Sequence, residues 1–314
     1  MQPIEVVTKQ IVKEMMNYKP TITFEARSVK EVSSILDIVL YESFVTFHVC
    51  EIRYFYNPFT HKAEIQPEYV YSQSEYHDWI NKIMDKLRAI KKQLDKYPSE
   101  LIKEKYIHDY LCKKVVYKEI GHESHCVLGP LFKGEGVCEG IAKTAQALFR
   151  IANLNAHIVC GDATDEKGTV GHAWNAVQIN GSWHLVDITY DNTISDPDFI
   201  RYDYFNVSAQ ELSASHTPYT YCSTYFNMCT TSLTYFRLKN IEFKNERDVY
   251  NFLKNEVERQ STYIYFKYTD INNPLKIDDL VDYVLNLPKA TNVNYSSDKQ
   301  MGVYYLKVKY SLFY

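Results

Sequence analysis

The chain has 314 residues, of which 46% are hydrophobic and 24% charged, so its composition is that of a globular protein and argues against global disorder. Its 35 Lys and Arg residues and 39 Asp and Glu residues give a net charge of −4 at pH 7, and without a basic excess we do not expect nucleic-acid binding. At roughly 100–200 residues per domain, the length predicts two domains or one core with substantial flanks.

The sequence contains neither a visible membrane span nor a visible secretory signal. No apolar run approaches the roughly 18–20 residues that a membrane helix needs. The first residues, Met1–Glu5, do not combine a basic stretch with an apolar one. The cysteines number seven, and this odd count favours reduced thiols over a disulfide framework. We therefore expect a cytoplasmic protein, or a secreted or cell-surface one if a signal peptide has been trimmed.

Residues 1–74 are predicted to form an N-terminal α+β module. Apolar residues recur at helical spacing at Ile4, Val7, Ile11 and Met15, and alternation over 21–26 predicts a strand. A second helix is expected after Ser28, because an acidic residue stands three positions later as in a capping box. Two strands are expected to follow, at 44–49 and 52–56.

Residues 75–219 are predicted to form the catalytic core. An apolar stripe over 80–94 predicts one helix, a second should begin after Pro98, and a third should span about 138–154. Strands are expected at 156–161, 172–179 and 183–190. Residues 220–314 are predicted to form a C-terminal α+β module, with strands at 234–243, 262–268 and 303–310 and helices near 246–258 and 276–287.

A cysteine stands where the third of these core helices is expected to begin. A Gly-x-Gly turn at 134–136 precedes Cys138, and an amphipathic stretch follows it. A helix N-terminus favours the thiolate over the thiol, and backbone N–H groups at such a turn can bind a developing oxyanion. Cys138 is therefore a candidate nucleophile. Taken alone, a buried structural cysteine is the alternative interpretation.

A predicted hairpin brings a histidine and an aspartate together. Asn180 and Gly181 favour a two-residue type I′ turn. In that register His172 and Asp187 share one face of the sheet as diagonal neighbours, about 7 Å apart at the backbone. Asp187 could then orient the imidazole of His172, which would take the proton of Cys138.

Three motifs together resemble a known family. Gly-Val-Cys138-Glu-Gly, Gly-His172-Ala-Trp-Asn and Trp-His-Leu-Val-Asp187-Ile-Thr-Tyr are similar to those of the transglutaminase-like superfamily, especially its bacterial members, over roughly residues 98–216. The resemblance implies an α+β fold with a papain-like core, in which a helix carrying the cysteine packs on an antiparallel sheet carrying the histidine and aspartate. It also implies that Cys138, His172 and Asp187 form a catalytic triad. The flanking modules lie outside the resemblance.

Residues around this triad are assigned more loosely. Trp174, His125 and Gly136 are candidates for the substrate cleft, although Trp174 could equally fill the core. The segment His122-x-x-His125-Cys126 has the residue types of a metal site but lacks four convergent ligands at recognised spacing, so we predict no metal. No phosphate-cradling or dinucleotide motif indicates a cofactor. We expect His216 to be structural, and no side chain is assigned to the oxyanion hole.

Two classes of function are consistent with these features. The first is a cysteine-dependent enzyme that transfers acyl groups from amide bonds through a thioester on Cys138. It would act as a transamidase if an amine is the acceptor, and as a protease or deamidase if water is. The expected substrate is a protein or peptide, with cell-wall peptide as one candidate. The second is a catalytically silent binding module that recognises such partners through its flanking units.

Overall fold

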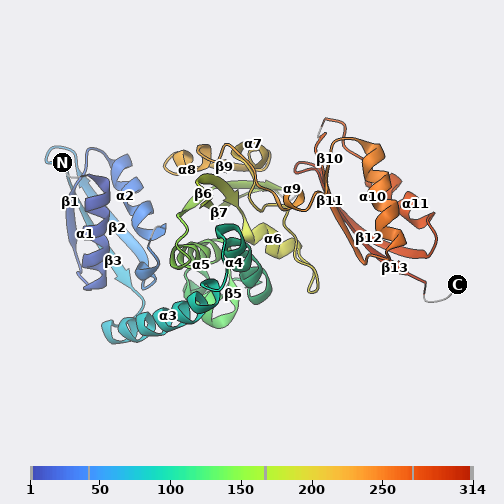
Figure 1. Cartoon of the computed structure of the whole chain (residues 1–314). Coiled ribbons are helices and arrows are strands. Elements are labelled where there is room, and N and C mark those ends of the chain that lie inside the picture. Colours follow the sequence, from blue (N-terminus) through green and yellow to red (C-terminus); the bar gives the residue numbers. More distant parts are fainter. Residues whose placement is uncertain (1–2, 42, 166–167, 271, 312–314) are drawn as a thin grey trace.

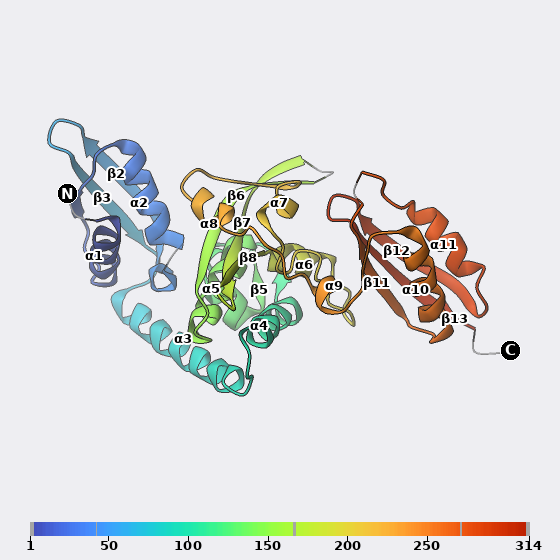
Figure 2. The same ribbon diagram turned by 45° about the horizontal axis from the view of Figure 1, so that its top comes forward.

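The computed structural model describes residues 3–41, 43–165, 168–270 and 272–311. They form three units in a row (Figure 1), and a view turned by 45° shows the same order, with the N-terminal and C-terminal units at opposite ends (Figure 2). Each unit combines helices with a sheet, so the predicted α+β class is confirmed. None of the described helices is long and apolar enough to cross a membrane.

The N-terminal unit pairs two helices with a three-stranded sheet. Its elements are α1 (Ile4–Met16), β1 (Ile22–Glu25), α2 (Val29–Tyr41), η1 (Phe44–Thr46), β2 (Val49–Asn57) and β3 (Lys62–Tyr69), with the antiparallel order β1-β3-β2. The strand predicted at 44–49 is wrong, because residues 44–46 form a 3₁₀ turn. The Thr46 hydroxyl is bonded to the carbonyl oxygens of Val39 and Ser43, a local alternative to strand pairing.

The central unit holds a four-stranded antiparallel sheet covered by helices. Its elements before the sheet are α3 (Gln73–Leu94), α4 (Glu100–Lys114), β4 (Val116–Tyr117), η2 (His122–His125), η3 (Gly129–Lys133), β5 (Glu135–Gly136) and α5 (Cys138–Ile151). The sheet consists of β6 (Ala156–Asp165), β7 (Gly168–Ile179), β8 (Ser182–Val186) and β9 (His216–Pro218), in the order β8-β7-β6-β9. Helix α5 packs against β7 and β6.

The hairpin between β7 and β8 has the predicted register but is shorter than predicted. Asn180 and Gly181 both have positive φ, 50° and 84°, as a type I′ turn requires, and Ile179 pairs with Ser182. The strand predicted at 183–190 is wrong beyond Val186, because the chain turns there into α6 (Ile188–Ile194). The carboxylate of Asp187 caps that helix, which explains why the strand ends at this point.

The C-terminal unit is a four-stranded sheet with two main helices. After α7 (Ala209–Leu212) and α8 (Ser223–Asn227) come α9 (Tyr235–Leu238), β10 (Glu242–Phe243), α10 (Glu246–Glu258), β11 (Tyr263–Tyr268), α11 (Ile277–Leu285), β12 (Ala290–Asp298) and β13 (Val303–Tyr310), with sheet order β10-β11-β13-β12. The strand predicted at 234–243 is wrong over most of its length. The Thr234 side chain accepts the backbone N–H of Arg237 and starts the helical turn α9 instead.

Three hydrophobic clusters underlie the three units. One lies within residues 7–65, one within residues 249–308, and the largest fills the central unit. The central cluster also takes in Phe236, Tyr265 and Met301, which lie beyond residue 219 in sequence. Residues of the C-terminal sheet therefore belong to the hydrophobic core of the central unit. The domain boundaries predicted at 74/75 and 219/220 stay predictions.

Candidate active site

Cys138 is the first residue of α5. Val137 before it is extended and serves as the N-cap, and the segment Glu135–Gly136 pairs with β4. The Cys138 side chain is partly exposed, and its sulfur forms no disulfide, since all seven cysteines of the chain are free. The start of a helix of 14 residues carries a partial positive charge. The local structure therefore provides a partly exposed thiol at a helix N-terminus.

His172 lies on β7 with its imidazole bonded to Asp187. The distance from His172 Nε2 to Asp187 Oδ2 is 2.6 Å, and the side chains are 5% and 0% exposed. Burial alone lowers the pKa of His172, but the charge of Asp187 and its hydrogen bond outweigh burial, and the Cys138 thiol acts in the same direction. The pKa of His172 is raised to about 10 as a result. Nε2 is occupied by Asp187, so Nδ1 is the ring nitrogen left for the thiol.

Asp187 is held by three donors. Its Oδ1 atom accepts the backbone N–H of Tyr190 at 3.0 Å, and its Oδ2 atom accepts from the rings of His172 and His216. Burial raises the pKa of Asp187, but the charge of His172 and the hydrogen bonds from both histidines prevail, and the pKa lies well below its usual range. The predicted contact between His172 and Asp187 is thus present, although the cap of α6 provides it rather than a strand.

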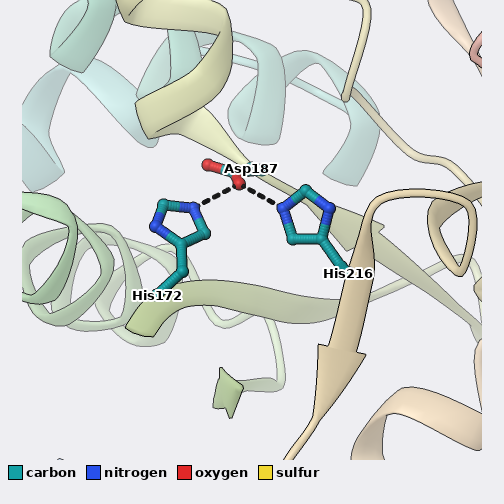
Figure 3. A group of neighbouring side chains, drawn as sticks. All are labelled: His172, Asp187 and His216. Carbon is teal, nitrogen blue, oxygen red and sulfur yellow. Dashed lines mark hydrogen bonds and ion pairs between the residues drawn. The ribbon is translucent and has the colours of Figure 1, made fainter. Parts of the chain in front are cut away.

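His216 is the second histidine on this carboxylate (Figure 3). Its Nε2 atom lies 3.1 Å from Asp187 Oδ2, and its Nδ1 atom lies 2.8 Å from the hydroxyl oxygen of Ser215. Since an ionised carboxylate only accepts, both imidazoles must donate through Nε2–H. Sequence reasoning missed this role, because His216 lies 29 residues after Asp187 and reaches it only through the pairing of β9 with β6.

Aromatic rings surround the two histidines. Trp174 is 1% exposed and packs beside both, with ring centroids 5.9 Å from His172 and 4.9 Å from His216. The ring of Tyr190 lies edge-on to His172, with a centroid distance of 5.1 Å. Trp174 therefore supports the site from the core and has almost no surface with which to touch a substrate.

The other two cleft candidates lie next to Cys138. His125, with 45% of its side chain exposed, is bonded through Nδ1 to Glu139 at 2.9 Å and through Nε2 to Glu119 at 2.7 Å. Gly136 is buried, and a Cβ built on it would lie 2.8 Å from the Cγ atom of Pro130. Gly136 is therefore required by packing, and His125 ties the loop before β5 to the first turn of α5.

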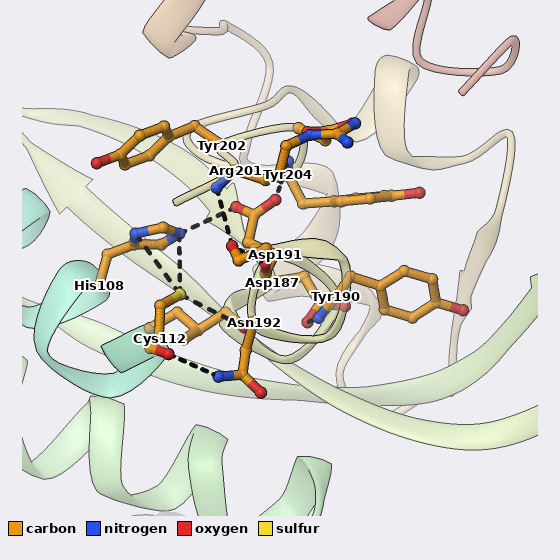
Figure 4. A network of polar contacts seen from close by, with 12 residues as sticks. His108, Cys112, Asp187, Tyr190, Asp191, Asn192, Arg201, Tyr202 and Tyr204 are labelled. Atoms are coloured by element: carbon orange, nitrogen blue, oxygen red, sulfur yellow. Dashed lines mark hydrogen bonds and ion pairs between the residues drawn. The ribbon is translucent and has the colours of Figure 1, made fainter. Parts of the chain in front are cut away.

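A polar network fixes the helix that Asp187 caps (Figure 4). His108 Nε2 lies 3.0 Å from Asp191 Oδ2, and both side chains are fully buried. The Asn192 side chain donates to the carbonyl oxygens of Cys112 and Val115, at 3.0 and 2.9 Å. These contacts join α6 to α4, and they therefore hold the backbone that carries Asp187.

The family comparison concerns the part of the chain that carries this geometry. Residues 88–188 match the model of the transglutaminase-like superfamily, a span that includes Cys138, His172 and Asp187. This part of the chain is therefore a transglutaminase-like superfamily domain, and the resemblance predicted from its motifs is confirmed. No curated protein matched the chain.

Solved structures that resemble this chain include three of related kinds. One is described as a TGase, with 16% identity and a TM-score of 0.30 over 54% of this chain and 50% of its own. A second, provisionally named a cysteine protease, is from Cytophaga hutchinsonii, with 18% identity and a TM-score of 0.30 over 44% of this chain and 61% of its own. A third, provisionally named a protease, is from Parabacteroides distasonis, with 10% identity and a TM-score of 0.25 over 43% and 35%. The chain thus spans between about a third and three fifths of their lengths.

Proposed function

We propose that the protein is a cysteine-dependent acyl-transfer enzyme that acts on amide bonds of a protein or peptide. The observation that carries this proposal is the 2.6 Å contact between His172 and Asp187 beside a thiol at the start of α5. An oriented imidazole next to a partly exposed thiol is the arrangement that activates a nucleophilic cysteine.

The proposed reaction has two stages. The Cys138 sulfur forms a bond to the amide carbonyl carbon, and His172 holds the thiol proton as an imidazolium. Collapse of the tetrahedral intermediate breaks the C–N bond, and His172 gives the proton to the leaving amine. The resulting thioester is resolved by water, which gives hydrolysis, or by an amine, which gives transamidation. Asp187 keeps the imidazolium oriented and stays ionised, because its pKa lies well below its usual range.

A binding module without catalysis is the alternative function. The two flanking units, each with its own hydrophobic cluster, are the structural feature that favours it. The two proposals differ in one property, which is the reactivity of Cys138 compared with that of the other cysteines.

The experiment is alkylation of the native protein with iodoacetamide from about pH 5 to pH 9, with peptide mapping of every cysteine. We expect modification of Cys138 first, persisting well below pH 8, and a marked loss of this selectivity in His172→Ala. The matched control is His184→Ala, which removes a buried histidine bonded to the carbonyl oxygen of Thr231. If Cys138 reacts no faster than exposed Cys50, the enzyme proposal fails and the binding module takes its place.

A further inference from the structure

A groove runs between the N-terminal unit and the central unit. One wall is α2, which contributes Lys30, Asp37 and two serines, and the other wall is the segment 218–221 at the end of β9. The groove has a volume of about 380 Å³. In both views α2 is on the side of the N-terminal unit that faces β6 and α8 (Figure 1, Figure 2). The groove therefore exists only because the N-terminal unit packs beside the central one.

The wall formed by residues 218–221 lies close to the proposed triad. Pro218 pairs with Gly161 of β6, and Gly161 pairs with His172 of β7. Pro218 is thus two strands away from His172, or about 10 Å at the usual strand spacing. A peptide chain that extends from the triad into the groove would cover this distance in about three residues.

The opposite wall is anchored near the proposed nucleophile. Tyr41 is the last residue of α2, and the ammonium nitrogen of Lys143 lies 5.1 Å from the centroid of its ring. Lys143 in turn donates to Glu139, the residue after Cys138, at 2.6 Å. One wall of the groove is therefore linked to β7 and the other to α5, the two elements that carry His172 and Cys138.

Asp37 is a carboxylate that lacks a partner in this groove. It is half-buried, and it makes no hydrogen bond or ion pair with any residue that the structure describes. Burial raises the pKa of Asp37. A carboxylate of this kind on the wall of a groove is suited to accept charge-assisted hydrogen bonds from a bound cation.

The wall opposite Asp37 is aromatic. Tyr219 and Tyr221 both line the groove, with ring centroids 6.2 Å apart, and 40% of Tyr219 is exposed. Aromatic rings opposite a carboxylate suit a long side chain that has an apolar stem and a cationic end. Lysine and arginine are the side chains of this type.

Lys30 adds a charge of the opposite sign. It stands seven residues before Asp37 on α2, so the two side chains are on the same side of the helix and about 10 Å apart along its axis. A metal ion does not suit this arrangement, because it needs several oxygen ligands at one point. Two opposite charges at this separation suit an extended peptide segment, which rises about 3.3 Å per residue.

We propose that the groove binds an extended segment of the substrate, and that Asp37 pairs there with a lysine or arginine about three residues from the reacting amide. The inference rests on the proposed acyl transfer, and it narrows the substrate class to peptides with a basic residue near that amide. It also assigns a role in substrate selection to the N-terminal unit, which lies outside the matched family domain.

The experiment measures the binding of three fluorescein-labelled peptides by fluorescence anisotropy at low ionic strength. The first is Lys-Gly-Gly-Gln-Gly-Gly-Lys, in which lysines on both sides of the glutamine make the chain direction irrelevant. The other two carry norleucine or glutamate in place of both lysines. We expect the wild-type protein to bind the lysine peptide about five-fold more tightly than the norleucine peptide, the effect of one partly exposed ion pair, and the glutamate peptide least.

Two variants test whether Asp37 causes this preference. Asp37→Lys should reverse the order, so that the glutamate peptide binds best, and Asp37→Asn should remove the preference. The matched control is Asp282→Lys, which makes the same change in net charge at an exposed position of α11 in the C-terminal unit and should keep the wild-type order. Circular dichroism shows whether each variant is folded.

The outcomes separate this inference from the proposed function. Equal binding of the three peptides by the wild-type protein overturns the inference, and so do the absence of binding and an unchanged order in Asp37→Lys. Alkylation by iodoacetamide is followed on the same samples. If Cys138 is not selectively alkylated but the preference depends on Asp37, the acyl transfer fails and the groove stands as a peptide-binding site. Selective alkylation without an effect of Asp37 supports the enzyme and refutes the groove.

Discussion

His216 Nε2 lies 3.1 Å from Asp187 Oδ2, the same oxygen that accepts His172 Nε2 at 2.6 Å. Asp187 is therefore shared by two buried imidazoles from different strands, β7 and β9. The hydrogen-bond partners of the His216 ring are Asp187 and Ser215. His216 is a positioning residue, which limits the freedom of the carboxylate that orients His172.

Replacement of His216 by phenylalanine should destabilise the protein. It removes a hydrogen bond to a buried charge, and such bonds contribute about 1.5–3 kcal/mol to the free energy of unfolding. Urea unfolding at pH 7 measures the change. His184→Phe is the control, because His184 is also buried but bonds only a neutral carbonyl at 2.9 Å, so its loss should cost about 1 kcal/mol. Equal losses in the two variants would show that the Asp187 carboxylate gains nothing from His216.

The raised pKa of His172 predicts a pH dependence of stability. A group whose folded pKa is above its unfolded value stabilises the fold fully below the unfolded pKa, near 6.5 for histidine, and loses this contribution as pH rises through the folded value of about 10. The unfolding free energies of wild type and His172→Gln should therefore differ most below about pH 6.5 and converge toward pH 10. A difference that is constant over this range would contradict a charged, Asp187-bound His172.

Sequence reasoning predicted that His172 and Asp187 meet, but not how the chain brings them together. The Asn180–Gly181 turn sets the register of the hairpin, and a two-residue turn has few alternatives. The same pattern could not show that the chain leaves the sheet at Asp187. The segment Val-Asp-Ile-Thr-Tyr at 186–190 consists mostly of residues that are frequent in strands. A helix forms there because Asp187 caps α6 and because Asp191 of α6 is bonded to His108 of α4.

Residues that reach the site through tertiary contacts were the ones missed. His216 arrives by the edge strand β9, which spans only His216–Pro218. A strand of this length is too short to show a period of hydrophobic residues. Helices α1 and α10, which carry clear apolar stripes, were predicted well. Strand β12, with mostly exposed residues, gave no such signal, whereas β3 was missed although its buried residues alternate with the others.

The second glycine of the Gly-Val-Cys138-Glu-Gly motif predicts a packing defect. A Cβ on Gly140 would lie 2.2 Å from the carbonyl oxygen of Ser124 and 3.0 Å from that of Cys126, so backbone would have to move. Gly140→Ala should therefore cost about 1–3 kcal/mol, as overpacking does, and slow the alkylation of Cys138. In the control Gly171→Ala, the nearest atom is the Tyr219 hydroxyl at an ordinary 3.5 Å. A Gly140→Ala protein with unaltered stability would refute this account of the motif.

A buried ion pair joins the central unit to the C-terminal sheet. Arg201 makes a bidentate contact with Asp203, at 2.8 and 2.6 Å, and donates to the Ser296 hydroxyl at 2.9 Å, while the Tyr265 hydroxyl donates to Asp203 at 2.6 Å. Arg201→Ala leaves Asp203 buried without its cation and should cost about 3–5 kcal/mol.

The control for that variant is Arg53→Ala. Arg53 lies in an exposed pair with Glu51 in the N-terminal unit, and such pairs contribute at most about 1 kcal/mol. Urea unfolding of both variants measures the contrast. A small loss in Arg201→Ala would mean that water or another cation replaces the guanidinium, and that the two units are not coupled through this residue.

Removal of metal ions provides the last test of the site. The ligand atoms of His172, Asp187 and His216 lie within 4.8 Å of one another, so these side chains could hold a metal ion, although their hydrogen bonds already account for the arrangement. We expect that EDTA leaves the selective alkylation of Cys138 unchanged. Added zinc should slow the alkylation, because zinc would bind the ring nitrogens of His172 and His216 that otherwise donate to Asp187. The zinc effect should weaken in His216→Phe, which lacks one ligand. Loss of Cys138 reactivity on chelation, restored by zinc, would instead identify a metal protein, and the two histidines would then be ligands rather than donors to Asp187.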